Sequence, residues 1–274
     1  MSILDPGERF LLIAGPCLLE DDRLNIAVAE EVSRVADRLG VSAIFKASFD
    51  KANRTSASSP RGPGLIEGLE RLGAVRRETG LPVLTDIHER GQADTVARTV
   101  DAIQIPAFLC RQTDLLNSAG NTGLPVNIKK GQWLAPEDMR YPVQKVLEAG
   151  AAGVSVTERG TVFGYGRWVV DMRSFAIMRE ACGCPVLFDA THSVQLPGAA
   201  PGGASSGGEP RWIETLARAA VAAGADGVFV ETHPNPSGAP SDGANMLPLG
   251  RLEGLIEGLL AIREARVGAP AEAE

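Results

Sequence analysis

Short runs of apolar and β-branched residues alternate along the chain with longer stretches in which apolar positions recur every three or four residues. Short apolar runs are typical of buried strands, and amphipathic stretches are typical of helices packed on one face. The pattern predicts strands at Phe10–Ala14, Val41–Phe45, Pro82–Thr85, Ala102–Ile105, Pro125–Ile128, Gly153–Val156, Pro185–Phe188 and Gly227–Val230. It predicts helices at about Asp22–Leu39, Gly64–Thr79, Glu89–Thr99, Gln112–Ala119, Pro136–Ala149, Met172–Ala181, Arg211–Ala223 and Leu249–Ala265.

The regular alternation of strand and helix predicts an α/β fold of the (β/α)8, or TIM-barrel, class. The sequence has 274 residues, near the usual size of about 250 residues for this barrel, and no shift in composition divides it. We therefore expect one catalytic domain over residues 1–274, with a short frayed tail at about 267–274. A doubly wound open sheet is the alternative, but Gly15-Pro16-Cys17 follows the first strand in place of a GxGxxG fingerprint.

The overall charge excludes two classes of partner. A net charge of -7 and a pI near 5.2 argue against nucleic acid and anionic membrane, so any attraction for anions must be local. No apolar run approaches the roughly 20 residues of a membrane span. Phe10–Leu19 imitates a signal-peptide core, but Asp5 and Glu8 precede it where a signal would be basic. The four cysteines lack a disulfide-framework spacing, so we expect a protein of the reducing cytoplasm.

Polar residues follow every predicted strand, at the end where TIM barrels place their active sites. The densest group is the loop Lys46–Ser56, KASFDKANRTS, which combines ammonium, guanidinium, amide and hydroxyl groups suited to a sugar phosphate. A solvated basic turn is the alternative. The chain has only five lysines beside 22 arginines, and four of the five follow apolar runs. This bias favours a pocket for anions.

Two sub-sites can be separated within these strand ends. Six cations from four predicted loops would repel one another unless anions neutralised them, which suggests two phosphorylated substrates, or a phosphate and a carboxylate: Lys46, Lys51, Arg54, Arg111, Lys129 and Arg159. Four further residues suit a borderline divalent metal such as zinc or ferrous iron: Cys17, His192, Glu231 and Asp242. Taken singly, a cysteine is often just packed in a core and a histidine just hydrogen-bonded. Their joint position at one barrel mouth favours the metal.

Seven motifs carry a resemblance to a known family: KANRTS, IAGPC, QIPAFLCRQTDLL, NIKKGQWLAP, TERGTVFGYG, FDATHSVQLPG and ETHPNPSGAPSDGANMLPL. The chain resembles the 3-deoxy-D-manno-octulosonate 8-phosphate synthases from about Phe10 to Leu260. These transferases condense phosphoenolpyruvate with D-arabinose 5-phosphate for lipopolysaccharide assembly. In that family a cysteine in IAGPC marks the metal-dependent class. The resemblance therefore implies one divalent ion per subunit (zinc, iron(II), manganese or cobalt) on Cys17, His192, Glu231 and Asp242.

The resemblance also implies a role for each matching residue. Phosphoenolpyruvate would be held by Lys51, Gln104, Lys129 and Arg159, with Lys46 beside them. The pentose phosphate would be held by Asn53, Arg54, Thr55 and Ser56, where Thr55 replaces the first serine of KANRSS in many relatives. Arg111, and with it Phe108, would reach the site of a neighbouring subunit in a homotetramer.

As a hypothesis, C3 of phosphoenolpyruvate attacks the sugar aldehyde, water adds at C2, and the hemiketal phosphate collapses to release inorganic phosphate. The candidate catalytic residues are Lys51, Asn53, Asp86, His88 and His192. His233 is a further candidate proton carrier, and for this histidine, as for Asp86 and His88, a purely structural hydrogen bond is the alternative.

Three other functions remain open, of which a sialic acid synthase is the most distant. The related 3-deoxy-D-arabino-heptulosonate 7-phosphate synthases read K-P-R-T/S where this chain has Lys51-Ala52-Asn53-Arg54, and the amide of Asn53 favours the longer sugar. A non-catalytic sugar-phosphate-binding protein would bind its ligands without releasing phosphate.

The sequence also predicts the roles of two smaller features. The glycine-rich segment Gly198–Gly208, within the loop 193–210, is expected to be a lid, and Cys182-Gly183-Cys184 is expected to be packing.

Overall fold

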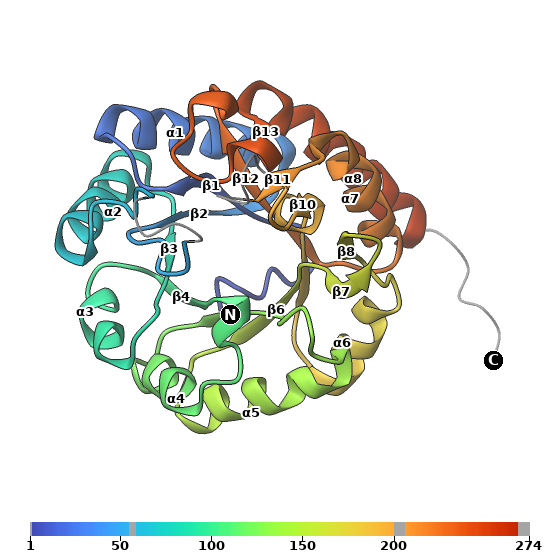
Figure 1. Ribbon diagram of the computed structural model, residues 1–274, viewed down its shortest axis with the longest axis horizontal. Helices are drawn as coiled ribbons and strands as arrows, with labels where there is room; N and C mark the ends of the chain where they lie inside the picture. Colours follow the sequence, from blue (N-terminus) through green and yellow to red (C-terminus); the bar gives the residue numbers. More distant parts are fainter. Residues whose placement is uncertain (1, 55–58, 200–205, 268–274) are drawn as a thin grey trace.

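Eight parallel strands form a closed barrel in the computed structural model, which describes residues 2–54, 59–199 and 206–267. The strands are β1 (Leu11–Leu18), β2 (Ser42–Ser48), β3 (Val83–Asp86), β4 (Ala102–Ile105), β5 (Val126–Lys129), β6 (Val154–Glu158), β9 (Val186–Asp189) and β12 (Gly227–His233). Each pairs with the next, and β1 pairs with β12 to close the ring. Figure 1 looks down this barrel. The predicted fold class and all eight predicted strands are confirmed.

A ring of helices surrounds the strands in Figure 1, as expected for a (β/α)8 barrel. They are α1 (Asp22–Leu39), α2 (Leu65–Thr79), α3 (Ala93–Val96), α4 (Thr113–Asn121), α5 (Arg140–Glu148), α6 (Ser174–Cys182), α7 (Ile213–Ala222) and α8 (Leu252–Val267). Helix α1 has its predicted bounds because both ends are capped: the Asp21 carboxylate accepts from the backbone N–H of Leu24, and Gly40 adopts a left-handed conformation. None of the helices described here is both long and apolar enough to cross a membrane.

The third predicted helix, Glu89–Thr99, is too long. The structure has a 3-10 turn at Arg90–Gln92 followed by only the short α3. The Gln92 side chain accepts hydrogen bonds from the backbone of His88 and Glu89, which tightens the start. After α3, backbone hydrogen bonds join residues that are three positions apart, such as Thr99 N–H to the Val96 carbonyl, and these bonds end the α-helix. The β-branched residues in this segment also disfavour its continuation.

Several strands extend further than predicted, and this changes where the polar residues lie. Cys17 lies inside β1 rather than after it, beyond an irregularity in the β1–β2 pairing between Ala14 and Cys17. The strands approach so closely here that a Cβ on Gly15 would lie 1.9 Å from the Lys46 carbonyl oxygen. Glycine therefore permits this bulge, and the residue that follows it is turned toward the barrel mouth.

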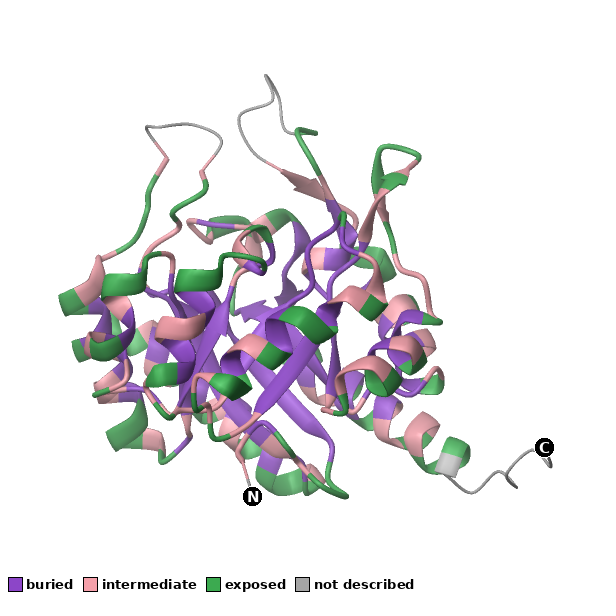
Figure 2. Ribbon diagram, turned by 90° about the horizontal axis from the view of Figure 1, so that it is seen from below, coloured by how far each residue is buried: buried purple, intermediate pink, exposed green. Residues whose placement is uncertain are grey.

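The barrel interior is apolar at the end where the strands begin. Leu4 from the N-terminal segment is fully buried and packs inside the barrel with Leu11, Ile13, Ile44, Leu84, Ala102, Leu187 and Phe229. A larger apolar layer lies between the strands and the helices. Figure 2 shows this buried layer in purple, covered by partly exposed helices. One end of the barrel is thereby closed, and polar chemistry is confined to the other.

Short strands outside the barrel were not predicted. Two antiparallel hairpins, β7 (Thr161–Gly164) with β8 (Arg167–Val169) and β10 (Gln195–Leu196) with β11 (Gly207–Gly208), follow β6 and β9, and β13 (Leu247–Pro248) pairs with β12. In Figure 2 the loops project from the end opposite the N-terminus. The expected lid at Gly198–Gly208 falls partly on residues 200–205, which lie outside the described residues.

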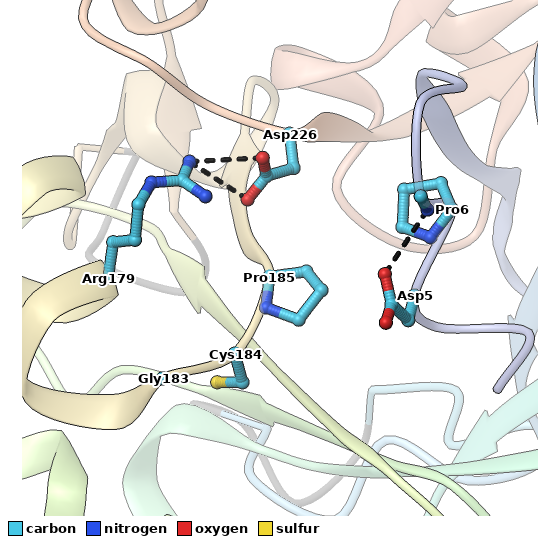
Figure 3. Close-up of a pocket in the computed structure, with 8 residues that line it drawn as sticks. Asp5, Pro6, Arg179, Gly183, Cys184, Pro185 and Asp226 are labelled. Atoms are coloured by element: carbon cyan, nitrogen blue, oxygen red, sulfur yellow. Dashed lines mark hydrogen bonds and ion pairs between the residues drawn. The ribbon is translucent and has the colours of Figure 1, made fainter. Parts of the chain in front are cut away.

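A small cleft of about 300 Å³ lies at the closed end, next to the residues that precede β1, β9 and β12. It contains Cys184, Pro185 and an ion pair of 3.0 Å between Arg179 Nη2 and Asp226 Oδ2 (Figure 3). Cys182 and Cys184 are free thiols, partly buried against the main core, as the packing interpretation predicts. This cleft is separated from the strand ends that carry the polar residues.

Candidate active site

A cleft of about 1510 Å³ opens at the carboxyl ends of the barrel strands. Most of the residues that the sequence singles out line it: Lys46, Lys51, Asn53, Arg54, Asp86, His88, Gln104, Phe108, Lys129, Arg159, His192 and Asp242. Cys17 and Glu231 are buried beside Asp242. Thr55 and Ser56 lie outside the described residues.

Three of the four predicted metal ligands form a tight group. The ligand atoms of Cys17, Glu231 and Asp242 all lie within 4.8 Å of one another. The Cys17 thiol donates to Asp242 Oδ2 at 3.3 Å. Cys17 and Asp242 both have left-handed backbones, with φ of 70° and 53°. Such conformations are uncommon outside glycine and cluster at functional sites, so the fold holds both side chains in place at some cost.

Glu231 is the least satisfied group in this cluster. Its side chain is 1% exposed, and neither carboxylate oxygen has a hydrogen-bond partner among the described residues. The nearest cation is the Lys51 ammonium, whose Nζ lies 3.9 Å from Oε1. A buried carboxylate without hydrogen bonds is costly unless a cation binds it.

His192 is the fourth predicted metal ligand, and it lies next to the other three. Its Nδ1 lies 2.8 Å from Asp189 Oδ2, so Nδ1 donates to that carboxylate and Nε2 faces the cluster. Nε2 is 3.4 Å from Glu231 Oε1, outside hydrogen-bond geometry. One sulfur, one imidazole nitrogen and two carboxylates, with a second-sphere carboxylate on the histidine, fit zinc or ferrous iron.

Electrostatics at the cluster also favour a cation. Burial raises the pKa of the Cys17 thiol well above its ordinary value, and the nearby Glu231 carboxylate adds to this effect. Burial alone would raise the pKa of Asp242, but His192 and Lys51 hold it below its ordinary value. The Cys17 thiolate that a metal requires is therefore unfavourable here until a divalent ion compensates its charge.

Two lysines lie buried deep in the cleft. Lys129 donates from Nζ to Asp189 Oδ2 at 2.5 Å, and its Nζ lies 3.1 Å from the centroid of the Phe229 ring. Burial lowers the pKa of Lys129 to about 8, although Asp189 opposes the shift. Lys46 donates to Ser48 Oγ at 2.8 Å and lies 3.3 Å from Asp86 Oδ1.

Asp86 and His88 form a connected pair beside Lys46. His88 Nε2 lies 2.9 Å from Asp86 Oδ2, and the Ser48 hydroxyl donates to Asp86 Oδ1 at 2.5 Å. Burial would raise the pKa of Asp86, but Lys46 and His88 hold it well below its ordinary value. With Nε2 donating to this carboxylate, Nδ1 of His88 carries a lone pair, and in the described part of the chain that atom has no partner. This geometry suits a proton acceptor.

Arg159 and Arg54 reach the loop that carries Asp242 by different routes. Arg159 Nη2 donates to Gln195 Oε1 at 2.8 Å, and Gln195 Nε2 donates to Asp242 Oδ1 at 2.8 Å. Arg54 Nη1 donates to Ser241 Oγ at 2.9 Å. Burial lowers the pKa of Arg159.

Sequence reasoning missed Gln195 and also Asn127. Asn127 is fully buried in β5 and accepts from Gln104 Nε2 at 2.8 Å while donating to Ser155 and Thr157 on β6. The only signal was an amide within an otherwise apolar strand, which is unusual enough to predict an inward-facing polar contact.

Other predicted residues lie away from the cluster. Arg111 is exposed and does not line the cleft, so one chain brings together five of the six predicted cations. Phe108 lies at the rim, 53% exposed, and stacks on Trp133 with ring centroids 6.0 Å apart. His233 Nε2 bonds to Glu20 Oε1 at 3.0 Å and its Nδ1 accepts from the Asn235 backbone, which is the structural role considered as its alternative.

Comparison with known proteins identifies the family of this chain. Residues 3–264 match the model of the DAHP synthetase I family. The chain is 56% identical to a 2-dehydro-3-deoxyphosphooctonate aldolase of Syntrophotalea carbinolica, over 92% of this chain and 90% of the relative. It is 56% identical to the protein of that name in Koribacter versatilis (94% and 93% covered) and 52% identical to that in Desulfotalea psychrophila (96% and 93% covered). The chain therefore belongs to the DAHP synthetase I family.

Proposed function

We propose that this protein is a metal-dependent 3-deoxy-D-manno-octulosonate 8-phosphate synthase. It would join phosphoenolpyruvate, D-arabinose 5-phosphate and water to give the octulosonate phosphate and inorganic phosphate. The curated relatives named as the corresponding aldolase, at 52% and 56% identity, support the reaction class. The observation that supports the metal dependence is the buried Glu231 carboxylate beside the Cys17 thiol, which accepts no hydrogen bond from the described residues, at the wall of a cleft with several cations.

The cations divide between the two substrates. Lys46, Lys51, Lys129 and Arg159, together with the amide of Gln104, would bind phosphoenolpyruvate. All of them except Lys51 are buried, where water is excluded and charge interactions are strong. Asn53 and Arg54, nearer the surface, would bind the pentose phosphate together with Thr55 and Ser56. Two anions can approach closely only because this group of cations offsets their repulsion, and their fixed orientation lowers the barrier to bond formation.

In the reaction, C3 of phosphoenolpyruvate forms the new bond to the aldehyde carbon of the sugar. Water adds at C2, and the C2–O bond to phosphate then breaks to release inorganic phosphate. Protons must move to the sugar oxygen and from the water. His88 lines the cleft and is oriented by Asp86 through Nε2, and its buried Nδ1 has no hydrogen-bond partner among the described residues. We assign His88 to this proton transfer.

Cys17, His192, Glu231 and Asp242 would hold the divalent ion. Such an ion, when bound, polarises an oxygen or acidifies a water. Independently of the ion, Asp189 orients His192 through Nδ1, and Lys51 provides positive charge next to Glu231. Burial lowers the pKa of Lys51, but Cys17, Glu231 and Asp86 outweigh it and keep the ammonium protonated.

We also propose a homotetramer in the cytoplasm of a bacterium that makes lipopolysaccharide. Arg111 is exposed three residues after Phe108, which stacks on Trp133, and Trp133 is 50% exposed. Exposed aromatics beside an arginine are typical of protein interfaces. In such an assembly Arg111 would supply the sixth cation to a neighbouring cleft.

One assay tests the proposal against its rivals. Purified protein loaded with zinc, iron(II), manganese or cobalt is mixed with phosphoenolpyruvate and either arabinose 5-phosphate or erythrose 4-phosphate, and phosphate release is followed. Release with arabinose 5-phosphate is expected. Binding of both substrates without release would instead indicate a sugar-phosphate-binding protein.

The second candidate is a 3-deoxy-D-arabino-heptulosonate 7-phosphate synthase, the activity after which the family is named. Preferential release with erythrose 4-phosphate would establish that activity. Asn53 is the discriminating residue, because its exposed amide lines the cleft where the longer sugar would add a hydroxyl.

A further inference from the structure

Gln195 joins the two sub-sites of the cleft through one amide group. It lies in β10, is 9% exposed, and accepts from Arg159 at Oε1 while donating to Asp242 from Nε2, each at 2.8 Å. Arginine can only donate and a carboxylate can only accept, so a single orientation of the amide satisfies both neighbours. Leucine would offer neither contact, and glutamate could not donate to Asp242.

The two ends of this contact chain lie in different sub-sites of the cleft. Arg159 Nη1 is buried at the cleft and has no partner within the described ranges, so this donor is available to an anion. At the other end, Asp242 Oδ2 accepts from the Cys17 thiol at 3.3 Å within the predicted metal cluster. An uninterrupted chain of contacts therefore runs from Arg159, whose Nη1 can donate a hydrogen bond to an anion, to the Cys17 thiol.

The backbone holds the amide against the loop that carries Asp242. Gln195 pairs with Gly208 across the β10–β11 hairpin. A Cβ on Gly208 would lie 2.6 Å from Asn245 Cβ and 2.7 Å from the Ala244 carbonyl oxygen. Gly208 thus permits close packing of the hairpin on the 3-10 turn Gly243–Asn245 that follows Asp242. The hairpin stem and the Asp242 loop form one packed unit.

We infer that Gln195 is a positioning residue that couples anion binding at Arg159 to cation binding at Asp242, so that phosphoenolpyruvate and the metal each tighten the other. An anion on Nη1 fixes the guanidinium, the guanidinium fixes the amide, and the amide holds Oδ1 so that Oδ2 stays directed at the cluster. Coupling between two binding sites is reciprocal. This inference deepens, and rests on, the proposed function.

Zinc affinity, measured by competition with a chromogenic chelator, tests the coupling without any turnover. It is measured with and without phosphoenolpyruvate for the wild type, Gln195→Leu and Gln195→Glu. Gln144→Leu, an exposed glutamine of α5, is the matched control. We expect phosphoenolpyruvate to tighten zinc about tenfold in the wild type and control. In Gln195→Leu, zinc should bind about tenfold more weakly, as for other outer-shell ligands, and the tightening should fall below about threefold.

Gln195→Glu retains the contact with Arg159 and loses the hydrogen bond donated to Asp242. Its affinity for phosphoenolpyruvate should therefore stay near that of the wild type while the coupling is reduced. A merely structural role for Gln195 would leave the tightening factor unchanged in folded variants, and that result would overturn the inference. If circular dichroism shows Gln195→Leu to be unfolded, Gln195→Glu decides by the same criterion.

The inference and the proposed function fail in different ways. Absence of phosphate release with arabinose 5-phosphate, together with intact coupling between zinc and phosphoenolpyruvate, refutes the function alone. Normal turnover with equal coupling in the wild type and the Gln195 variants refutes the inference alone.

Discussion

At the scale of single residues, Glu231 lowers the stability of the fold but is suited to bind a cation. Its carboxylate is buried, neither oxygen has a hydrogen-bond partner in the described ranges, and its nearest cation is 3.9 Å away. A group of this kind destabilises the fold unless something positive binds it. The proposed metal ion would supply that positive charge.

Glu231→Gln removes that charge, and we expect two opposite effects. Zinc should no longer bind with high affinity. Metal-free protein should unfold at a temperature about 2–4 °C higher than metal-free wild type, since removing a buried carboxylate that lacks hydrogen bonds should stabilise the fold by about 1 kcal/mol. Zinc content by atomic absorption and thermal unfolding measure the two effects. Glu180→Gln, at an exposed position of α6, should change neither. A lower unfolding temperature for metal-free Glu231→Gln would contradict the account.

If Lys129 binds phosphoenolpyruvate as proposed, that binding should depend on pH. Burial lowers its pKa to about 8, opposed by Asp189 and assisted by the neighbouring cations Lys46 and Arg159. Below this pH the ammonium is charged and attracts the substrate, and above it the group loses its proton while the substrate stays fully ionised. The KM for phosphoenolpyruvate should therefore rise by about tenfold per pH unit well above pH 8.

Lys129→Arg is the matched variant, because a guanidinium does not lose its proton in this range. Its KM, even if higher throughout, should vary little between pH 7 and 9.5. A wild-type KM that is flat over the same range would show that Lys129 does not titrate in the free enzyme.

The residues of the candidate site were predictable to an unequal degree. Cys17, Glu231 and Asp242 could be grouped because all strands of a barrel end at one mouth, whatever their separation in sequence. Gln195 could not, because its importance depends on two hydrogen bonds across loops whose conformation leaves no periodic trace.

At the scale of elements, the irregularity in β1 turns a strand into part of the site. Gly15 lies against the Lys46 carbonyl of β2, and the bulge that follows gives Cys17 its left-handed backbone. The pairing of β1 with β2 therefore positions the Cys17 thiol without a contribution from any loop.

Gly15→Ala should disrupt this arrangement. Its Cβ would lie 1.9 Å from a backbone oxygen in a barrel strand, so the strands must separate, and we expect a loss of about 3 kcal/mol or more in the free energy of unfolding. The matched control is Gly254→Ala in α8, where a Cβ meets nothing within 4 Å and helix propensity predicts a gain of about 0.5–1 kcal/mol. Urea unfolding of both variants tests the difference, and equal stabilities would refute this role of Gly15.

The elements themselves were predicted where burial dictates the pattern. Parallel strands are covered on both sides and read as continuous apolar runs, which is why all eight were found. The elements that were predicted wrongly or missed are short. Helix α3 is shortened by side-chain hydrogen bonds, and β10 and β11 have two residues each. Two residues are too few for any alternation to be visible.

At the scale of the whole molecule, a single chain leaves one predicted cation outside its own cleft. Arg111 is exposed, whereas Lys46, Lys51, Arg54, Lys129 and Arg159 all line the cleft. If the proposed tetramer forms, Arg111 of each subunit acts in the cleft of a neighbour. The unit of function is then the assembly and not the barrel.

Mixing two inactive variants tests this directly. Arg111→Ala lacks the donated cation but keeps its metal ligands, and Glu231→Gln lacks a ligand but keeps Arg111. If the two are dissociated and reassembled together in equal amounts, Arg111→Ala subunits that receive a Glu231→Gln neighbour regain a complete site. About a quarter of wild-type activity is expected for random association around one shared contact per site. Cys17→Ala mixed with Glu231→Gln should stay inactive, because every cleft in that mixture lacks a ligand. No recovery in the first mixture, with normal assembly by light scattering, would place Arg111 outside the neighbouring site.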